Sequence, residues 1–277
     1  MRVFFFRPYN TLFMQFATKK INNEVVREVP QLTEKDTRPV KGANLFPEIY
    51  SNIFLCAKKK SGKTSTIFKI LKTCCGSNTK IIVFCSTLHK DSSWETIQAW
   101  ADHYGHPFNG NTSLKEDGVD LLDELVEGLE KKTTPAAKIR NILDSDSEDE
   151  EEKKPSRTRS PEYIIILDDL SNQLKSSSLT TLLKKNRHFK CKILISSQYL
   201  NDIPPESRKQ MDYWILFKGH PKKKLLEIYQ DADISVPFET FEAIYDFATE
   251  KPYSFLYIDP TDGTFRRNFN YQIEVPS

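Results

Sequence analysis

Residues 53–64 read "IFLCAKKKSGKT", an apolar run that breaks into three lysines and then Ser-Gly-Lys-Thr. The P-loop pattern is a glycine, four residues and then Gly-Lys-Ser/Thr, placed between a buried strand and a helix. Ala57 stands at the first glycine position, and Gly62, Lys63 and Thr64 complete the pattern. An alanine adds one methyl group there and is tolerated where its φ is negative.

This stretch predicts a cradle for the phosphates of a nucleotide. Backbone N–H groups of the tight loop point at phosphate oxygens, and the following helix presents its positive end. Lys63 is expected to reach the β- and γ-phosphates, and the Thr64 hydroxyl to ligate Mg²⁺. The alternative is a basic surface loop that spells the motif by chance. The predicted nucleotide-binding residues are Ala57, Lys58, Lys59, Lys60, Ser61, Gly62, Lys63, Thr64 and Ser65.

A second motif, "IIILDD" at residues 164–169, indicates what the cradle is for. Asp168 at the strand tip would hold Mg²⁺ through water, and Asp169 would orient and polarise the attacking water. Two adjacent acids favour ATP hydrolysis over phosphoryl transfer to a small molecule. The alternative is a pair of capping aspartates at the end of an ordinary strand.

The next strand ends in "SSQ", which places Gln198 beside the phosphates as a sensor of the γ-phosphate or a holder of the water. No "NKxD"-like guanine-reading sequence follows the later strands, which argues against a GTPase. The order of P-loop strand, further strand, acidic strand and polar strand end is typical of the additional-strand, catalytic-acid class of P-loop ATPases.

Continuous Ile-, Val- and Phe-rich runs, rather than alternating ones, indicate strands buried on both faces. With the helical patterns between them, they predict an α/β fold whose mostly parallel central sheet is flanked by helices. "YSFLYID" and "TFRRNFNYQI", joined by "PTDG", add a C-terminal antiparallel hairpin. The apolar runs are 52–56, 80–85, 163–168, 192–197 and 213–217, and the helical patterns are 64–74, 92–104, 118–132, 174–186, 221–230 and 237–249.

One main domain is expected from a chain of 277 residues. We assign residues 1–45 to an N-terminal extension and residues 46–277 to the P-loop ATPase domain. A dense acidic run followed by a basic one interrupts this domain at about 134–160 and predicts a disordered insertion.

Charge and apolar content limit the surroundings of the protein. The net charge is only +2, so contact with nucleic acid would depend on local patches. No run approaches the roughly 20 apolar residues of a membrane span. The five cysteines lie in or beside apolar runs without metal-ligand spacing, which indicates buried thiols in a reducing compartment. An intracellular protein is expected.

Beyond these motifs, the chain resembles the FtsK/HerA-type genome-packaging ATPases of large DNA viruses, virophages and Polinton-like elements. The similarity runs from about residue 52 to residue 270. It is carried by "AKKKSGKT", "STLHKDSSW", "IIILDD", "KKNRHFKCKILISSQ", "LNDIPPESRKQMDYWILFKG" and the closing "YSFLYID" and "FRRNFN". The chain departs from the wider class at Ala57 and at Asp169, where many relatives have Gly and Glu.

The resemblance implies an ATP-driven translocase of double-stranded DNA that assembles as a ring and loads a genome into a preformed capsid, with a capsid or portal component as partner. It would act where virions assemble, in the host cytoplasm or nucleus, or travel with the virion. An arginine from the next subunit would complete each site, with Arg187 as first candidate and Arg208 as second. Sequence-independent DNA contacts would come from Lys222–Lys224, Lys184–Lys185 or Arg266–Arg267.

Two other functions stay open at this point. A nucleoside or nucleotide kinase would need an arginine-rich lid helix and an acceptor pocket, and neither is evident in the sequence. A nucleotide-binding scaffold that does not hydrolyse ATP is suggested by Ala57 and by the acidic insertion as a docking tail.

Overall fold

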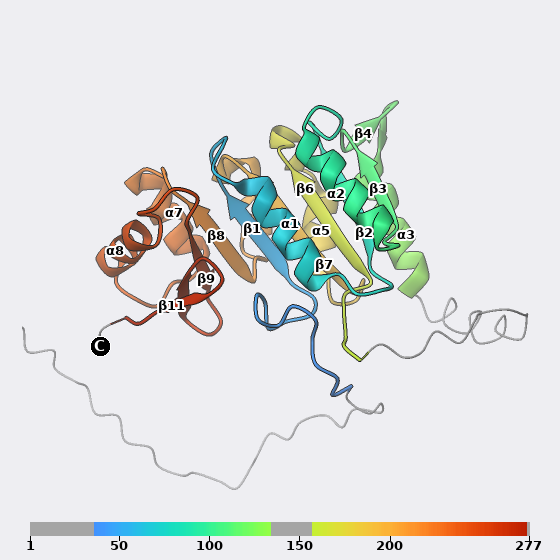
Figure 1. The fold of residues 1–277 in the computed structure, drawn as a ribbon. Coiled ribbons are helices and arrows are strands. Elements are labelled where there is room, and N and C mark those ends of the chain that lie inside the picture. Colours follow the sequence, from blue (N-terminus) through green and yellow to red (C-terminus); the bar gives the residue numbers. More distant parts are fainter. Residues whose placement is uncertain (1–35, 134–156, 276–277) are drawn as a thin grey trace, which may run out of the picture. The chain divides into compact units, whose positions relative to one another are not determined.

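The computed structural model describes residues 36–133 and 157–275, and the compact unit that carries the P-loop spans residues 38–277. Its centre is a nine-stranded sheet in the order β11-β10-β9-β8-β1-β7-β6-β2-β3 (Figure 1). The strands are β1 (Asn52–Cys56), β2 (Lys80–Cys85), β3 (Phe108–Asn111), β6 (Tyr163–Asp168), β7 (Cys191–Ser197), β8 (Tyr213–Phe217), β9 (Phe255–Asp259), β10 (Thr264–Arg267) and β11 (Tyr271–Ile273).

The strands from β8 across to β3 are all parallel, so their carboxyl ends meet at one edge of the sheet. Every residue of β1, β6, β7 and β8 is buried, as the continuous apolar runs predict. The strand β7 lies between the P-loop strand β1 and the acidic strand β6. This inserted strand is the defining feature of the additional-strand class, so the predicted fold class is confirmed.

Helices cover both faces of the sheet, and each face has its own apolar core. The alternate residues Ile53 and Leu55 of β1 face the core that α1 and α2 cover, whereas Phe54 faces the core that α3, α5, α7 and α8 cover. In Figure 1, α1 and α2 lie in front of the strands and α5 behind them. The helices are α1 (Lys63–Cys74), α2 (Ser92–His103), α3 (Leu121–Thr133), α5 (Ser177–Lys184), α6 (Pro205–Arg208), α7 (Lys222–Asp231) and α8 (Phe238–Ala248).

The C-terminal hairpin extends the sheet beyond β8, to which β9 pairs antiparallel. The predicted second arm of the hairpin, residues 264–273, forms two strands rather than one. The chain turns back at Asn268, which has a left-handed φ of 56°. Its amide oxygen accepts from the N–H of Phe255 at 3.2 Å, and this contact ties the turn to the start of β9.

The helices predicted at 118–132 and 174–186 both begin three residues later than their patterns suggest, and the first of them shows why. Residues Lys115–Glu116 (β4) and Val119–Asp120 (β5) pair as a small hairpin, with Gly118 at a left-handed φ of 84°. The helix α3 starts only at Leu121, because the Asp120 carboxylate accepts from the N–H groups of the first turn at 3.0 and 3.2 Å. The edge strand β3, "FNGN", was not predicted, since its sequence has no apolar run.

Residues near the predicted domain boundary pack against the sheet. Leu45 and Phe46 are 2% and 0% exposed, and Val40 forms an isolated bridge with Arg159. Residues 1–35, and the part of the predicted insertion at 134–156, lie outside the described residues, so the domain boundaries stay predictions.

All five cysteines are buried and free. Within the described residues, no helix is both long and apolar enough to cross a bilayer.

Candidate functional site

The segment between β1 and α1 forms a tight loop at the carboxyl edge of the sheet. Ala57 is fully buried, has no positive φ, and donates its N–H to the carbonyl of Ser197 at 3.0 Å. It therefore continues the pairing of β1 with β7 and meets the condition under which alanine replaces the usual glycine. Lys60 and Gly62 have left-handed φ values of 62° and 95°, and they turn the chain into the start of α1.

The P-loop lysine lies against both acidic residues at the end of β6. The Nζ atom of Lys63 is 2.9 Å from Oδ1 of Asp168 and 3.9 Å from Oδ1 of Asp169. Asp168 is buried, its side chain 3% exposed, whereas that of Asp169 is 25% exposed. The two strand ends thus bring a cation and two carboxylates together, as predicted from two motifs about 100 residues apart in sequence.

Asp169 is held in a constrained backbone conformation. Its φ is 55°, a left-handed value that costs a side-chain-bearing residue free energy. Its N–H donates to the carbonyl of Ser196 at 3.1 Å, and its own carbonyl accepts from the Ser86 hydroxyl at 2.9 Å. These contacts with β7 and with the end of β2 turn the Asp169 carboxylate away from the strand and toward Gln198.

Gln198 joins the same cluster from the end of β7. Its Nε2 donates to Oδ1 of Asp169 at 3.0 Å, and its carbonyl accepts from Nζ of Lys224 at 2.8 Å. Lys224 thus holds the backbone of Gln198, and Asp169 holds its side-chain amide. The carboxylate and the amide face the same space and can hold one water between them.

Asp168 has a thiol as its other neighbour. The Cys85 Sγ atom, at the end of β2, lies 3.7 Å from Oδ2 of Asp168. Burial, and secondly the charge of Asp168, raise the pKa of the Cys85 thiol to about 11, so the thiol stays protonated at neutral pH and is a weak donor to the carboxylate.

A buried histidine supports the loop from the β8 side. Nε2 of the His220 ring lies 3.2 Å from the carbonyl of Cys56, and the backbone N–H of His220 donates to the Tyr245 hydroxyl at 3.1 Å. Burial, and then the charge of Lys224, lower the pKa of His220 to about 4. The imidazole is therefore neutral at pH 7 in the folded protein.

This histidine predicts a pH dependence of stability. The pKa of His220 in the folded protein lies below the ordinary value of 6.5, so between these two values the unfolded chain binds a proton that the folded protein does not bind. The free energy of unfolding therefore decreases as the pH falls from about 6.5 toward 4. Urea titrations of the wild type and of His220→Gln, which does not titrate, should show the wild type losing about 2 kcal/mol more between pH 7 and pH 5. Equal losses in both proteins would contradict this assignment.

The two predicted arginine-finger candidates lie apart from this cluster. Arg187 precedes β7, at the amino ends of the parallel strands, and its side chain is 64% exposed and paired with Glu48 at 2.8 Å. Arg208 ends α6 and its side chain is 11% exposed, 3.2 Å from Asp231. The structure therefore does not bring either arginine to the P-loop of its own chain.

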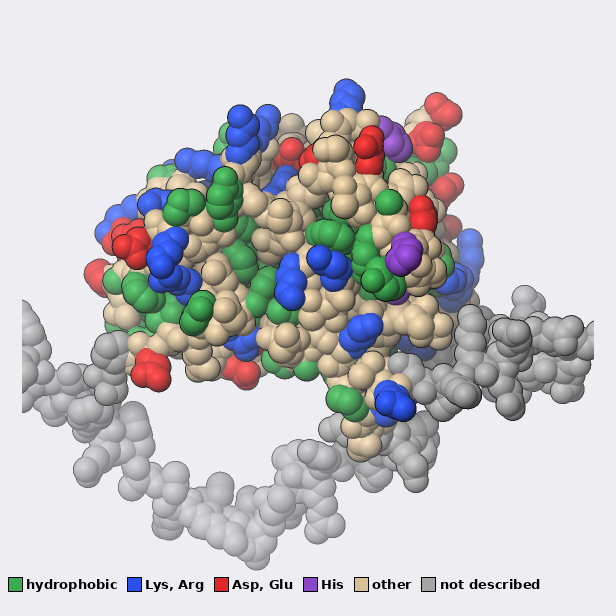
Figure 2. All heavy atoms as spheres, viewed as in Figure 1, with side chains coloured by type: hydrophobic (Ala, Val, Ile, Leu, Met, Phe, Trp, Pro, Cys, Tyr) green, Lys and Arg blue, Asp and Glu red, His purple; other side chains and the backbone are tan. Residues whose placement is uncertain are grey.

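Basic residues gather near the P-loop. Figure 2 shows Lys and Arg side chains along the upper edge of the molecule, where β1 ends in Figure 1. Of the three predicted DNA-contacting runs, Lys222–Lys224 begins α7 at this edge and Lys184–Lys185 ends α5 at the opposite edge; Arg266–Arg267 lies in β10. Exposed lysines beside the loop are Lys58, Lys59, Lys60, Lys218, Lys223 and Lys251.

Several contacts of the site were not predicted. Ser86 and Cys85 reach the aspartates from β2, Lys224 reaches Gln198 from α7, and the Tyr253 ring packs over Gly62. The residues at the end of β2 could have been predicted to lie near the aspartates, because the carboxyl ends of parallel strands share one edge of the sheet. Lys224 and Tyr253 have no local signal, because their positions depend on how distant segments pack.

Part of the chain is similar in sequence to known viral proteins. The family described as "Poxvirus A32 protein" matches residues 134–228, which include β6, β7 and β8. The uncharacterized protein 075L of Invertebrate iridescent virus 6 is 32% identical over 106 residues, which are 37% of this chain and 41% of that protein. The matched part is thus less than half the length of this relative.

Two solved structures have a similar fold. One is the genome packaging NTPase B204 of Sulfolobus turreted icosahedral virus 2 in complex with AMP, with a TM-score of 0.51 and 18% identity over 83% of this chain and 100% of that one. The sulfate complex of the same protein has a TM-score of 0.51 and 19% identity over 79% and 96%. The fold is that of P-loop NTPases, and the predicted resemblance to viral packaging ATPases is confirmed.

Proposed function

We propose that this protein hydrolyses ATP to translocate double-stranded DNA, and that it packages a viral genome into the capsid. The observation that carries the enzymatic part is the cluster of Lys63, Asp168, Asp169 and Gln198 at the carboxyl edge of the sheet. The cation lies within 4 Å of both carboxylates, and the amide is hydrogen-bonded to Asp169. The two aspartates stand at the end of β6 and Gln198 just after β7, whereas Lys63 begins the helix that follows β1. All of these positions lie at the carboxyl edge of the sheet, where α/β proteins bind ligands.

The phosphates would lie at the start of α1, over the loop of residues 57–65. Lys63 would neutralise the β- and γ-phosphates, and Gly62 lets the backbone approach them. Asp169 and Gln198 would hold the attacking water in line with the γ-phosphate. Asp169 is the carboxylate that a water can reach, because its side chain is 25% exposed, whereas that of Asp168 is 3% exposed and lies against Lys63.

The residues also fit a magnesium ion. Thr64 follows Lys63, and Asp168 offers a carboxylate with a side chain that is only 3% exposed. Hydroxyl and carboxylate oxygens are the ligands that Mg²⁺ prefers, usually with several retained waters. When bound, Mg²⁺ would supply positive charge to the β- and γ-phosphate oxygens as the bond to the leaving group breaks.

The DNA-packaging part rests on the comparisons. A poxvirus A32 match over residues 134–228 and the fold of a genome packaging NTPase support this function, as does the partial similarity to an iridescent virus protein. Double-stranded DNA would be held without sequence preference through lysines near the P-loop edge, so binding should weaken steeply with salt. A capsid or portal component is the further partner, at the site of virion assembly inside the host cell.

A ring of identical subunits is part of this proposal. Neither arginine candidate reaches the P-loop of its own chain, which is the expectation for a residue that acts on a neighbour. Arg187 is the better candidate, because its exposed side chain is free to turn outward from Glu48, whereas Arg208 is nearly buried against Asp231. Glu48 would be the partner that Arg187 leaves when the subunit interface forms.

A mixing experiment tests Arg187. Subunits with Arg187→Ala should bind ATP normally but hydrolyse it about 10³-fold more slowly, because the lost charge acts only on the transition state. Mixed with Lys63→Ala subunits they should partly recover ATPase activity, since one interface in the mixture joins an intact P-loop to an intact arginine. Arg157→Ala, which removes another exposed arginine, is the control. If the mixture assembles but stays as inactive as both parents, Arg208 becomes the candidate.

Hydrolysis measured with and without DNA separates this function from the alternatives. A packaging motor should hydrolyse ATP faster when linear double-stranded DNA is added. A nucleotide kinase would respond to an acceptor nucleotide instead, and a scaffold would bind ATP without turnover. ATP turnover that is indifferent to DNA at low salt would contradict the translocase.

A further inference from the structure

Three consecutive lysines begin α7, and each has a different environment. Nζ of Lys222 pairs with Oε2 of Glu242 at 2.7 Å and lies over the ring of Phe238, so this lysine is attached to α8. Lys223 is exposed, and within the described part of the chain it has no ion pair. Lys224 instead reaches the end of β7. Of the three, Lys223 is therefore the one that can take a DNA phosphate without losing a partner.

Lys224 is held at the end of β7 by two contacts. Its Nζ donates to the carbonyl of Gln198 at 2.8 Å and lies 5.6 Å from the centre of the Tyr199 ring, a cation–π contact. Among the described residues, the same carbonyl has one other side-chain donor, the Sγ atom of Cys56 at 3.9 Å. A thiol is a weak donor. Lys224 is thus the main side chain that fixes the backbone of Gln198.

The segment before α7 determines where this lysine stands. The Tyr245 hydroxyl of α8 donates to the carbonyl of Phe217 at 2.8 Å and accepts from the backbone N–H of His220 at 3.1 Å. The His220 ring in turn lies 3.2 Å from the carbonyl of Cys56, at the end of β1. The start of α7 is therefore attached both to α8 and to the P-loop strand, and Lys224 has a defined place relative to the ends of β1 and β7.

We propose that Lys224 is a positioning residue that fixes Gln198 for hydrolysis, and that DNA held by Lys223 acts on the site through it. The Gln198 amide donates to Asp169 at 3.0 Å, so a shift of the Gln198 backbone moves the group that would hold the attacking water. Lys223 and Lys224 are adjacent on the first turn of α7, so a DNA phosphate that draws Lys223 acts on the turn that holds Gln198. The inference rests on the proposed function and names how DNA would regulate that site.

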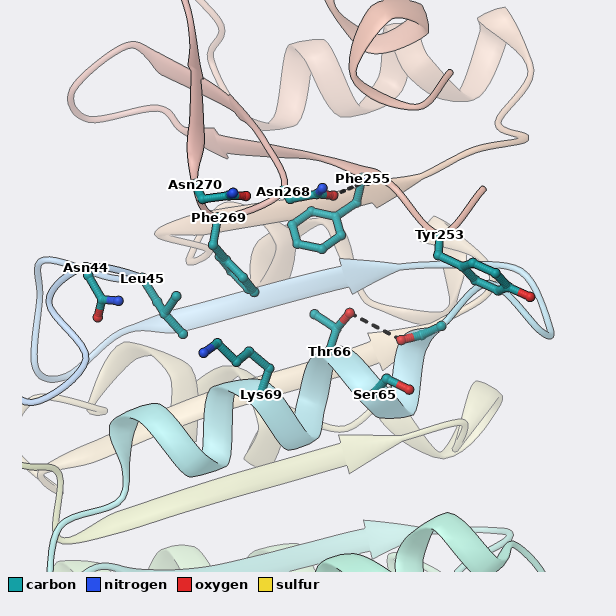
Figure 3. Close-up of a pocket in the computed structure, with 11 residues that line it drawn as sticks. Asn44, Leu45, Ser65, Thr66, Lys69, Tyr253, Phe255, Asn268, Phe269 and Asn270 are labelled. Carbon is teal, nitrogen blue, oxygen red and sulfur yellow. Dashed lines mark hydrogen bonds between the residues drawn. The ribbon is translucent and has the colours of Figure 1, made fainter. Parts of the chain in front are cut away.

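The space beside the nucleotide cradle does not involve α7. A cavity of about 840 Å³ lies between α1 and the segment that joins β10 to β11 (Figure 3), and Gly62 and Ser65 of the cradle line it. None of the described residues 217–224 lines this cavity. Loss of the Lys224 side chain should therefore lower kcat and leave the affinity for the nucleotide unchanged.

A double-mutant cycle on the full-length protein, measured by single-turnover hydrolysis, tests the positioning role. Lys224→Met should slow hydrolysis about tenfold, because the Gln198 carbonyl loses its charged donor. Binding of the magnesium complex of a non-hydrolysable ATP analogue should not change. Lys224→Arg keeps a charged donor and should recover most of the rate. In a Gln198→Ala background, Lys224→Met should have no further effect, since it acts only through Gln198. Equal factors in both backgrounds would overturn the positioning role.

Stimulation by linear double-stranded DNA tests the route. Lys223→Met should bind DNA more weakly, with a log–log salt slope that is shallower by about one. Lys224→Met should bind DNA like the wild type yet show a smaller maximal stimulation of hydrolysis. Lys209→Met removes an exposed lysine just after α6, which precedes the amino end of β8, and as the control it should match the wild type.

Two results would overturn the DNA route: wild-type DNA binding by Lys223→Met, or wild-type stimulation of Lys224→Met. A wild-type protein without ATP turnover would instead contradict the proposed function. The two claims therefore fail separately.

Discussion

Replacing Lys63 with alanine is expected to lower ATP turnover by at least about a hundredfold, since the ammonium is the cation closest to the phosphates in the proposed site. The protein should remain folded, because the Lys63 side chain covers no apolar core. Asp168 loses its partner at 2.9 Å, so a small decrease in melting temperature is expected. Steady-state hydrolysis and circular dichroism of the same preparation measure both effects.

Lys72→Ala is the control for this variant, because it removes an exposed lysine from the same helix without touching the site. Its turnover should match the wild type. A well-folded Lys63→Ala protein that hydrolyses ATP at a near-normal rate would remove the P-loop assignment, and with it the proposed function.

Changing Asp169 to asparagine should stop hydrolysis while leaving the binding of MgATP nearly intact, with a fall in kcat of about a hundredfold or more. The asparagine amide oxygen can still accept from Nε2 of Gln198, now at 3.0 Å, so the geometry is kept and only the base is lost. Asp168→Asn should instead weaken the magnesium-dependent part of ATP binding.

Titrating ATP with and without Mg²⁺, alongside single-turnover hydrolysis, distinguishes the two aspartates. The proposed division of labour predicts that only Asp168→Asn loses the magnesium enhancement of affinity. If both variants weaken binding equally, the carboxylates act together on the metal, and the water-holding role assigned to Asp169 is wrong.

The central sheet could be predicted closely, because its strands are buried on both faces and therefore read as continuous apolar runs. Four of the five predicted strands have the bounds that the structure gives, and β7 begins one residue earlier than expected. The unpredicted strand β3 shows the limit of the method. Its sequence "FNGN" is polar because it lies at a sheet edge, where only partial burial is required.

The proposed catalytic cluster was also predictable, because parallel strands bring their carboxyl ends together. Its members stand at or just after the ends of β6 and β7, or at the start of the helix that follows β1. Lys63, Asp168, Asp169 and Gln198 are neighbours for that reason. The surrounding contacts were not predictable, because the partners of these groups come from other segments. Tyr253 lies 191 residues after Gly62 in the sequence, and only the pairing of β9 with β8 brings it to the loop.

Arg187 illustrates a different limit. In sequence it stands just before β7, near Gln198, yet the two residues lie at opposite ends of that strand. Closeness in sequence to Gln198 therefore does not place Arg187 close to the predicted phosphate site. Its role depends on a second copy of the chain, and no pattern within one sequence specifies how two copies meet.

If ATP hydrolysis moves this protein along double-stranded DNA, the displacement of a third strand from a linear duplex measures that movement directly. With MgATP, the full-length protein should release a labelled triplex-forming strand, and release should begin later when the strand lies farther from the duplex end. The Lys63→Ala protein should release none. Normal ATP hydrolysis on the same DNA without any release of the strand would contradict the proposed DNA translocation.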